Sequence, residues 1–355
     1  MLIRLACKLF NDDARYFLDP ILMSEEVNKL VLYRNSSPLH RELEIHNKLE
    51  GVYHNASFKY ICRLYRIVCD REAANIYVGI YEIPHGIYAL LGAKINKKPA
   101  VVSIIGNPKF EIRNKGIRKI ITNWIYKLAD VVTVTGTESK KYLVEQKSLN
   151  PNKIFVLPNS IPVDSFFSQN QDRKYDLITL GRLSPEKGLF TMIEVVKVLK
   201  DIMPNVRLGI AGKGPLLDDL RKCIVEGDLE DNIDLLGYVE NATDFLNMGK
   251  VFIATSFTEG MPRTVIQSMA CETPAVTTDV GDMKDLVIPG KTGYLIKDRD
   301  DIRKIAEETY NILNDEKLRY LYARNCQLHI QENFSHEAAK AVWENIFEYL
   351  NGKST

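Results

Sequence analysis

Two successive series of short β-branched segments, each alternating with helical patterns, place the strongest constraint on the fold of this 355-residue chain. The first series predicts strands at 2–6, 29–33, 76–80, 100–105, 131–134 and 153–157, and the second predicts strands at 176–180, 207–211, 232–236, 251–254, 275–278 and 294–296. Strands that alternate with helices form parallel sheets covered by helices. A polar stretch, Gln169-Asn-Gln-Asp172, separates the series. We therefore expect an α/β protein with two doubly wound, Rossmann-like domains, 1–167 and 175–334, that face a cleft.

After residue 298 the strand pattern stops, and three helical patterns follow, the last over 335–351. The length suits two domains, and the 45% hydrophobic and 26% charged residues are near the averages of globular proteins. Ligands of open parallel sheets bind beyond the carboxyl ends of the strands. The segments that follow the expected strands are therefore where functional residues should lie.

One such segment is Gly181-Arg-Leu-Ser-Pro-Glu-Lys-Gly188, directly after the first strand of the second series. Arg182 and Lys187 flank the start of the next expected helix. A guanidinium fork and a mobile ammonium suit two phosphates whose charge grows as a bond to them breaks. Alone, such a segment is more often a turn with two solvated cations than a phosphate-binding site. The surrounding sequence is needed to distinguish the two.

A second segment, Glu259-Gly-Met-Pro-Arg-Thr-Val-Ile-Gln267, also lies between an expected strand and an expected helix. The helix should begin near Pro262, where backbone N–H groups can face an anion. We expect Glu259 and Gln267 to bracket the binding crevice. The spacing of Glu259 and Gln267 alone is weak evidence for a binding site, since acidic residues are common at helix starts. The order and the surroundings of the two segments together are stronger evidence.

Residues 175–296 resemble the donor-binding half of the retaining glycosyltransferases of family 4, which have the two-domain GT-B fold. The resemblance rests on six segments in the same order: Leu180-Gly-Arg-Leu-Ser-Pro-Glu-Lys-Gly188, Ile210-Ala-Gly-Lys-Gly-Pro215, Leu236-Gly-Tyr-Val239, Ser256-Phe-Thr-Glu-Gly260, Ala270-Cys-Glu-Thr-Pro-Ala-Val276 and Gly290-Lys-Thr-Gly-Tyr-Leu-Ile296. The first half is similar more loosely, through Ile83-Pro-His-Gly86, Ala129-Asp-Val-Val-Thr-Val134 and Leu157-Pro-Asn-Ser-Ile-Pro-Val-Asp164. The resemblance implies that the acceptor binds there and that the last helix packs back on the N-terminal domain.

The resemblance also implies a mechanism. A nucleotide-diphosphate sugar would lie along the C-terminal domain, with its base near 237–239 and its ribose within reach of Gln267. Arg182 and Lys187 would stabilise the leaving diphosphate, Glu259 would bind sugar hydroxyls, and these three would be the catalytic residues. The implied donor-binding residues are Gly181, Val239, Gly260, Met261, Pro262, Arg263, Thr264 and Gln267. Attack from the same face would retain the anomeric configuration, and the two cations would replace a metal, so no metal or other cofactor is expected.

The chain departs from the family pattern at several positions. Gln267 stands where a second glutamate is usual, and residues 8–13 replace a glycine-rich loop after the first strand. Where similar enzymes often have a histidine, this chain has Ile105 followed by Gly106 and Asn107. Asn107 and His85 are the acceptor-side candidates, although His85 is equally well explained as a histidine at a helix start with no chemical role.

Charge is distributed unevenly along the chain. Residues 1–167 contain 24 Lys and Arg against 16 Asp and Glu, and the remainder contains 23 against 30. The segment Lys109–Lys127 has six cations, one acid and interleaved apolar residues (Phe110, Ile117, Ile121, Trp124), and Lys59, Arg63 and Arg66 share a face of a helix expected over 57–70. This pattern suits an anionic membrane surface, whereas the alternative is an ordinary amphipathic helix with solvated cations. The sequence has no nucleic-acid-binding motif.

Localisation follows from similar observations. Apolar runs are shorter than the ~20 residues of a membrane span, and charges after Met1 interrupt any signal sequence. We expect a cytoplasmic protein, peripheral on the inner face of the cell membrane. The six cysteines form no Cys-x-x-Cys pair, so reduced thiols are expected and a zinc site is not.

The sequence thus predicts a retaining hexosyltransferase that moves a sugar from a nucleotide-diphosphate sugar to a glycan or lipid-linked acceptor, in cell-surface polysaccharide or glycolipid synthesis. Two alternatives stay open. A sugar-nucleotide 2-epimerase would need carboxylates in the N-terminal half, for which Asp12, Asp13 and Glu82 are candidates. A non-catalytic sugar-nucleotide-binding subunit would fit Gln267 and the missing glycine-rich loop. The donor base, the sugar and the acceptor are not specified.

Overall fold

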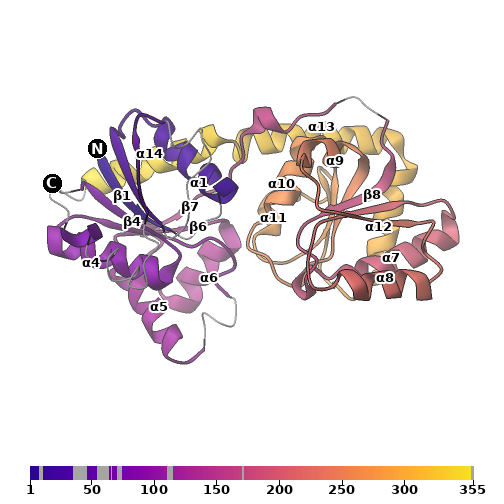
Figure 1. Cartoon of the computed structure of the whole chain (residues 1–355), viewed down its shortest axis with the longest axis horizontal. Helices are drawn as coiled ribbons and strands as arrows, with labels where there is room; N and C mark the ends of the chain where they lie inside the picture. Colours follow the sequence, from indigo (N-terminus) through magenta and orange to yellow (C-terminus); the bar gives the residue numbers. More distant parts are fainter. Residues whose placement is uncertain are drawn as a thin grey trace. The chain divides into compact units, whose positions relative to one another are not determined.

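The computed structural model describes residues 1–7, 11–34, 46–53, 64, 66–69, 74–109, 115–169 and 172–352. The chain divides into two compact units: unit 1 comprises Met1–Ser160 and His336–Thr355, and unit 2 comprises Ile161–Ser335 (Figure 1). The boundary between the units, at residues 160 and 161, comes before the polar stretch 169–172 that the sequence suggested as the linker. The reason is that Ile161 and Phe166 are buried in a core of unit 2.

Unit 1 is built on a seven-stranded parallel sheet of order β3-β2-β1-β4-β5-β6-β7. Its strands are β1 (Leu2–Ala6), β2 (Lys29–Arg34), β3 (Leu49–Tyr53), β4 (Ile76–Ile80), β5 (Ala100–Ser103), β6 (Val131–Val134) and β7 (Ile154–Val156). Every residue of β1, β4, β5 and β6 is buried, as expected for strands covered on both faces. The order reverses between β1 and β4, which is the topological switch point of this sheet.

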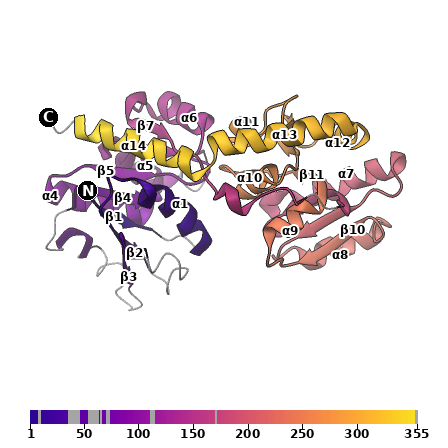
Figure 2. The same ribbon diagram turned by 90° about the horizontal axis from the view of Figure 1, so that it is seen from above.

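The helices of unit 1 include one from the far end of the chain. Among the described residues they are α1 (Asn11–Met23), a π-helical turn (Glu82–Gly86), α4 (Ile87–Asn96), α5 (Gly116–Leu128), α6 (Thr137–Lys147), a 3-10 turn (Pro151–Lys153) and α14 (His336–Gly352). Trp343 and Phe347 of α14 are fully buried in the core that contains α1, and the ring of Trp343 meets Phe17 edge-on at 5.9 Å between centroids. Figure 2 shows α14 beside α1. The expected return of the last helix to the first domain is confirmed.

Unit 2 contains a six-stranded parallel sheet of order β10-β9-β8-β11-β12-β13. Its strands are β8 (Tyr175–Leu180), β9 (Leu208–Ala211), β10 (Ile233–Gly237), β11 (Gly249–Ala254), β12 (Ala275–Thr278) and β13 (Gly293–Ile296). Residues Leu177 of β8 and Val251 of β11 are paired in register. The strand order reverses between these two neighbours, so the loops that follow β8 and β11 meet at the switch point.

Helices cover both faces of the second sheet. They are α7 (Leu189–Ile202), α8 (Leu217–Glu226), α9 (Ala242–Asn247), α10 (Arg263–Ala270), α11 (Met283–Leu286), α12 (Ile302–Asn314) and α13 (Glu316–Asn333), with 3-10 turns at Val163–Ser165 and Pro185–Lys187. Val251 and Ile253 of β11 pack with α7 and α12, whereas Phe252 and Ala254 pack with α10 and α13. This alternation is the two-residue period of a strand buried on both faces.

The two doubly wound domains expected from the sequence are therefore confirmed. Within the described residues, no helix has both the length and the apolar composition needed to cross a membrane.

Candidate functional site

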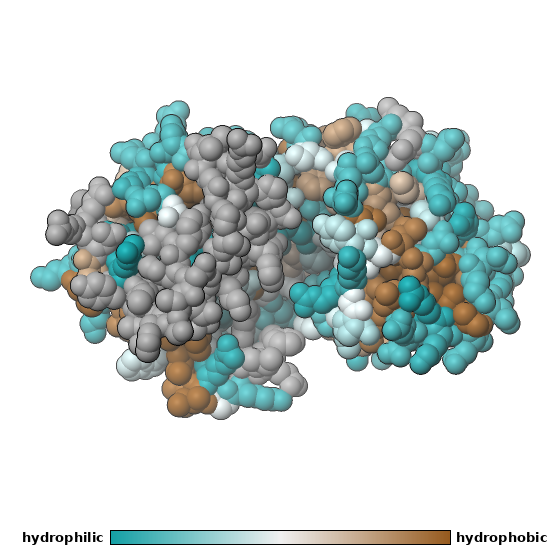
Figure 3. Space-filling model, viewed as in Figure 1, coloured by the Kyte–Doolittle hydropathy of each residue, from teal (hydrophilic) through white to brown (hydrophobic). Residues whose placement is uncertain are grey.

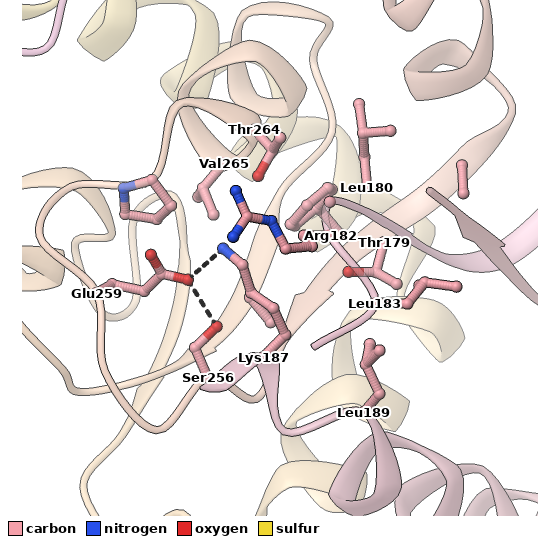
Figure 4. A pocket seen from close by; sticks show the side chains of 15 residues that line it. Thr179, Leu180, Arg182, Leu183, Lys187, Leu189, Ser256, Glu259, Thr264 and Val265 are labelled. Atoms are coloured by element: carbon pink, nitrogen blue, oxygen red, sulfur yellow. Dashed lines mark hydrogen bonds and ion pairs between the residues drawn. The ribbon is translucent and has the colours of Figure 1, made fainter. Parts of the chain in front are cut away.

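A pocket in unit 2 lies at the switch point between β8 and β11. Its walls come from the loop after β8, the loop after β11 and the start of α10 (Figure 4). The lining residues are Thr179, Leu180, Gly181, Arg182, Leu183, Lys187, Leu189, Ala211, Phe252, Ala254, Ser256, Glu259, Pro262, Thr264 and Val265. Both segments that the sequence singled out therefore contribute to one pocket.

The loop after β8 is fastened to the loop after β11. Gly188 has a left-handed backbone (φ 64°), and a Cβ added to it would lie 1.9 Å from the carbonyl oxygen of Thr255. The Thr255 hydroxyl donates a hydrogen bond to the Gly188 carbonyl at 2.8 Å, and the Phe257 N–H donates to the Glu186 carbonyl at 2.8 Å. This close approach fixes Lys187, which precedes Gly188, against the second loop.

Lys187 and Glu259 form an ion pair inside the pocket. The Lys187 ammonium donates to Oε1 of Glu259 at 2.6 Å, and the Ser256 hydroxyl donates to the same oxygen at 2.9 Å. The side chains of Lys187 and Glu259 are 26% and 14% exposed. Because both hydrogen bonds go to Oε1, the carboxylate is oriented, and Oε2 can accept hydrogen bonds from a ligand.

Arg182 adds a second positive charge to the same pocket. Its side chain is exposed, and Figure 4 shows its guanidinium and the Lys187 ammonium both directed into the space that the pocket residues surround. Between them in sequence, the Ser184 hydroxyl donates to Glu186 at 2.6 Å and lowers the pKa of that carboxyl, with smaller contributions from the charges of Lys187 and Arg182. Glu186 therefore stays ionised, and the loop holds two cations and one anion.

The first turn of α10 supplies backbone donors. Pro262 occupies the N-cap position and has no side-chain acceptor for the first N–H groups of the helix. Thr264 and Val265 of this turn line the pocket. The positive end of the helix dipole thus points at the space that Arg182 and Lys187 border, an arrangement that favours a phosphate group.

A third loop supports the turn that carries Glu259. Gly281, after β12, has a φ of 60°, and a Cβ added to it would lie 2.1 Å from the carbonyl oxygen of Glu259. The N–H of Asp282 donates to the carbonyl of Gly260 at 2.9 Å. The backbone at 259–260 therefore packs directly on Gly281. Any other residue at position 281 would displace this part of the backbone.

Comparisons with known proteins agree with this geometry. The model of the family described as Glycosyl transferases group 1 matches residues 160–328, which include every pocket residue. The crystal structure of HepE from Anabaena in complex with UDP superposes with a TM-score of 0.82, covering 99% of both chains at 16% sequence identity.

The fold is GT-B, and the comparisons support a glycosyltransferase.

Two curated relatives extend over most of this chain. The capsular polysaccharide biosynthesis glycosyltransferase CapM of Staphylococcus aureus is 25% identical over 75% of this chain and 74% of its own length. The UDP-Gal:alpha-D-GlcNAc-diphosphoundecaprenol alpha-1,3-galactosyltransferase of Escherichia coli is 24% identical over 78% of this chain and 76% of its own length.

The pocket of unit 2 brings together only part of the set predicted from the sequence. Gly181, Arg182, Lys187, Glu259, Pro262 and Thr264 line it. Gly260 and Arg263 are half-buried beside these residues in sequence, Met261 is buried in the core, and Val239 packs against that core. Gln267 lies further along α10, is 8% exposed, and is not part of the pocket lining. The roles assigned to these residues stay predictions.

Sequence reasoning gave no role to Ser256, Thr255 or Gly281. Each follows a strand of the second sheet at its carboxyl end, and this position was the available signal. Ser256 donates to Glu259, three residues further along the same loop, whereas the partners of the other two lie on other loops: Thr255 donates to Gly188, and Gly281 lies against the carbonyl of Glu259. These last two contacts appear only when the strand order is known.

The acceptor-side candidates lie in unit 1. His85 is buried in the π-helical turn after β4, where its ring meets Tyr88 edge-on at 6.1 Å between centroids. Asn107 is half-buried, and its side-chain oxygen accepts a hydrogen bond from the Lys109 N–H at 2.9 Å. Contact of either residue with an acceptor stays a prediction. Lys59, Arg63 and Phe110 lie outside the described residues.

A protein site for a metal ion usually needs several side chains of His, Cys, Asp or Glu close together. Within the described ranges, no three side chains of His, Cys, Asp or Glu are grouped closely enough to bind one. Asp298 and Asp300 have Asp-x-Asp spacing, but both are exposed and neither lines the pocket. Metal-independent transfer stays a prediction that a chelator can test.

Proposed function

We propose that this glycosyltransferase is a retaining, metal-independent hexosyltransferase of family 4. It would move a sugar from a nucleotide-diphosphate sugar to a glycan or lipid-linked acceptor in the synthesis of a cell-surface polysaccharide or glycolipid. The observation that carries the proposal is the convergence of Arg182, Lys187, Glu259 and the first turn of α10 on one pocket at the switch point of unit 2.

The pocket offers separate groups for the two parts of the donor. The diphosphate takes the cations and the N–H groups of α10, which stabilise charge as it develops on the leaving group. The Glu259 carboxylate, oriented by Ser256, accepts hydrogen bonds from hydroxyls of the sugar. Arrival of the diphosphate competes for the Lys187 ammonium and leaves Oε1 of Glu259 available as well.

Transfer exchanges one bond at the anomeric carbon for another. The acceptor oxygen bonds to that carbon from the face that the diphosphate leaves, and the bond between the carbon and the phosphate oxygen breaks. The acceptor proton passes to the departing phosphate oxygen, so no side chain has to act as a base. The anomeric configuration of the donor is kept.

The relatives suggest which donors and acceptors should be tested first. HepE has been crystallised with UDP, and the name of the E. coli relative specifies UDP-galactose and a diphosphoundecaprenol-linked acceptor. CapM is named for capsular polysaccharide biosynthesis. We therefore propose UDP-sugars as the first donors to test and a lipid-diphosphate-linked glycan as the first acceptor class.

The two alternative functions have less support. Among the carboxylates that an epimerase could use, Glu82 is buried and accepts a hydrogen bond from the Tyr126 hydroxyl at 2.5 Å. That carboxylate is engaged in the core. A non-catalytic binding subunit would use the same ion pair and helix start to bind the donor, so release of the nucleoside diphosphate is the observation that separates it from an enzyme.

The test is incubation of the purified chain with a panel of UDP- and GDP-sugars. We expect slow release of the nucleoside diphosphate from one donor, insensitivity to EDTA, and, with an acceptor, a product whose anomeric configuration equals that of the donor by NMR. An epimerised nucleotide sugar formed without acceptor would favour the epimerase. Donor binding with no release under any condition would favour the binding subunit.

A further inference from the structure

Helix α5 of unit 1 exposes a continuous apolar face. Ile117, Ile120, Trp124 and Leu128 are 75%, 65%, 68% and 59% exposed. Their spacing of three, four and four residues places them on one side of the helix. Figure 3 shows the resulting brown patch at the foot of unit 1, where Figure 1 draws α5. Four large apolar side chains in one row are unusual on the surface of a soluble domain.

The same helix already has an apolar face that packs on its own domain. Ile125 and Tyr126 are buried in the core formed with β5 and β6, and Ile121 packs against it. A surface helix needs only one such face to be held in place. The exposed row is therefore not required for the fold of unit 1 and is available for a partner.

Positive charge is concentrated on the same helix. Lys115, Arg118, Lys119 and Lys127 come from α5 or its N-cap position, and the helix sequence GIRKIITNWIYKL contains no acidic residue. All four of these cationic residues are exposed. An apolar row with flanking cations matches the interface of an anionic bilayer, where apolar side chains enter between headgroups and cations meet phosphates.

Two neighbouring segments extend the positive region. The ammonium groups of Lys109 and Lys147 lie 5.9 Å and 5.6 Å from the ring centroid of Tyr142 on α6. Burial, and next the charge of Lys119, lower the pKa of Lys147, so the positive potential of α5 reaches α6. Cations from three segments of unit 1 therefore lie in one region.

We propose that the exposed face of α5, with the cations of the same helix, docks unit 1 onto an anionic bilayer. Trp124 suits this position because its ring is apolar and its N–H is polar, as in the aromatic belts at membrane interfaces. A second copy of the chain is a poorer occupant. A symmetric contact through α5 would bring together two surfaces that each carry the cations of this helix and no acidic residue from it. The inference concerns a surface of unit 1 and goes beyond the donor chemistry of unit 2.

The experiment is co-sedimentation of the full chain with vesicles of phosphatidylcholine alone or mixed with phosphatidylglycerol. We expect binding to the anionic vesicles only, weakened by at least tenfold when salt rises from 0.1 M to 1 M, because the Debye length falls from ~10 Å to ~3 Å. Two variants divide the surface: Ile117→Ser with Trp124→Ser removes apolar contact, and Arg118→Ser with Lys119→Ser removes charge. Each should weaken binding by at least tenfold.

A matched control lies on unit 2. Lys222 and Val225 of α8 are both exposed, and Val225 is 57% exposed. The variant Lys222→Ser with Val225→Ser replaces two exposed side chains, as each α5 variant does, one of them a cation and one apolar, and it should bind vesicles like the wild type. A loss in this control equal to that in the α5 variants would overturn the assignment to α5.

Fluorescence supplies an independent measurement. The chain has two tryptophans, Trp124, which is 68% exposed, and Trp343, which is fully buried. Anionic vesicles should shift the emission of Trp124 to shorter wavelength, and Trp343→Phe should leave that shift in place. Binding that ignores lipid charge and salt, or an α5-dependent dimer in sedimentation velocity without vesicle binding, would overturn the proposal. UDP-induced thermal stabilisation of every variant, measured in parallel, reports on the donor pocket separately.

Discussion

The ammonium of Lys187 lies 2.6 Å from Oε1 of Glu259, although 72 positions separate the two residues in the chain. They become neighbours because β8 and β11 are adjacent strands at the point where the strand order reverses. One segment supplies the charge that a diphosphate needs, and the other supplies a carboxylate for sugar hydroxyls. The parallel-sheet topology therefore assembles the pocket from two segments that are each uninformative alone.

The paired cations give the first prediction. Arg182→Ala or Lys187→Ala should lower turnover by roughly 10²-fold, the scale observed when one transition-state donor is lost. The fold should persist, because Arg182 is exposed and the Lys187 side chain lines a pocket, at 26% exposure, rather than a packed core. Steady-state kinetics with the active donor, beside circular dichroism, test this. Lys222→Ala on α8 is the control for a lost exposed cation, and near-normal turnover in both pocket variants would remove the cations from the mechanism.

The sequence predicted the fold well because its central strands are buried on both faces. Such strands appear as short runs of apolar and β-branched residues, as in Val131–Val134 and Ala275–Thr278, and these bounds agree with the structure. The strand Leu49–Tyr53 was missed, since it lies at the sheet edge and contains Glu50 and Gly51. Edge strands lack the two buried faces that give the signal.

The site was predicted less completely, for a physical reason. The charges of Arg182, Lys187 and Glu259 can be read directly from the sequence, and they suggest which ligand groups each residue could bind. The contact between Gly188 and Thr255, and the support of Glu259 by Gly281, depend on which loops the sheet order brings together. Gln267 shows the converse case, because its spacing from Glu259 predicts a place in the crevice, whereas the structure buries it outside the pocket lining.

Gln267 is the subject of the second prediction. If its amide binds a ribose hydroxyl of the donor, Gln267→Glu should remain active, and Gln267→Leu should weaken donor binding by about 1 to 3 kcal/mol. Isothermal titration with UDP or the active donor measures the affinity. A thermal melt of each variant controls for packing, because the side chain is 8% exposed. Equal donor affinity in all three proteins would mean that Gln267 serves only the packing of α10.

The third prediction uses two glycines with similar backbones and different surroundings. Gly281 and Gly290 have φ of 60° and 73°, but an added Cβ meets the Glu259 carbonyl at 2.1 Å at Gly281 and nothing within 4 Å at Gly290. Gly290→Ala should cost about 1 to 2 kcal/mol of stability for the left-handed backbone alone. Gly281→Ala should cost a further ~1 to 3 kcal/mol, as overpacking does.

Gly281→Ala should also change function, because the clash displaces the turn that carries Glu259. We expect weaker donor binding in this variant and unchanged donor binding in Gly290→Ala. Chemical denaturation gives the two stabilities, and UDP titration gives the affinities. Equal losses of stability in both variants, with donor affinity intact, would contradict the role assigned to the contact between Gly281 and Glu259.

The last prediction concerns acid and the loop between the two cations. The hydrogen bond from Ser184 lowers the pKa of Glu186 in the folded chain below its unfolded value. A carboxyl of this kind stabilises the fold at pH above its unfolded pKa, and the contribution is lost as pH falls through the folded pKa. Ser184→Ala should therefore lower the melting temperature at neutral pH, and the deficit relative to wild type should shrink progressively in acid. The effect should be at most about 1 kcal/mol, because exposed charges are screened. Ser184→Thr keeps the hydroxyl and should restore the wild-type pH profile of melting, and a deficit that is the same at every pH would show that Ser184 acts through packing rather than through the charge of Glu186.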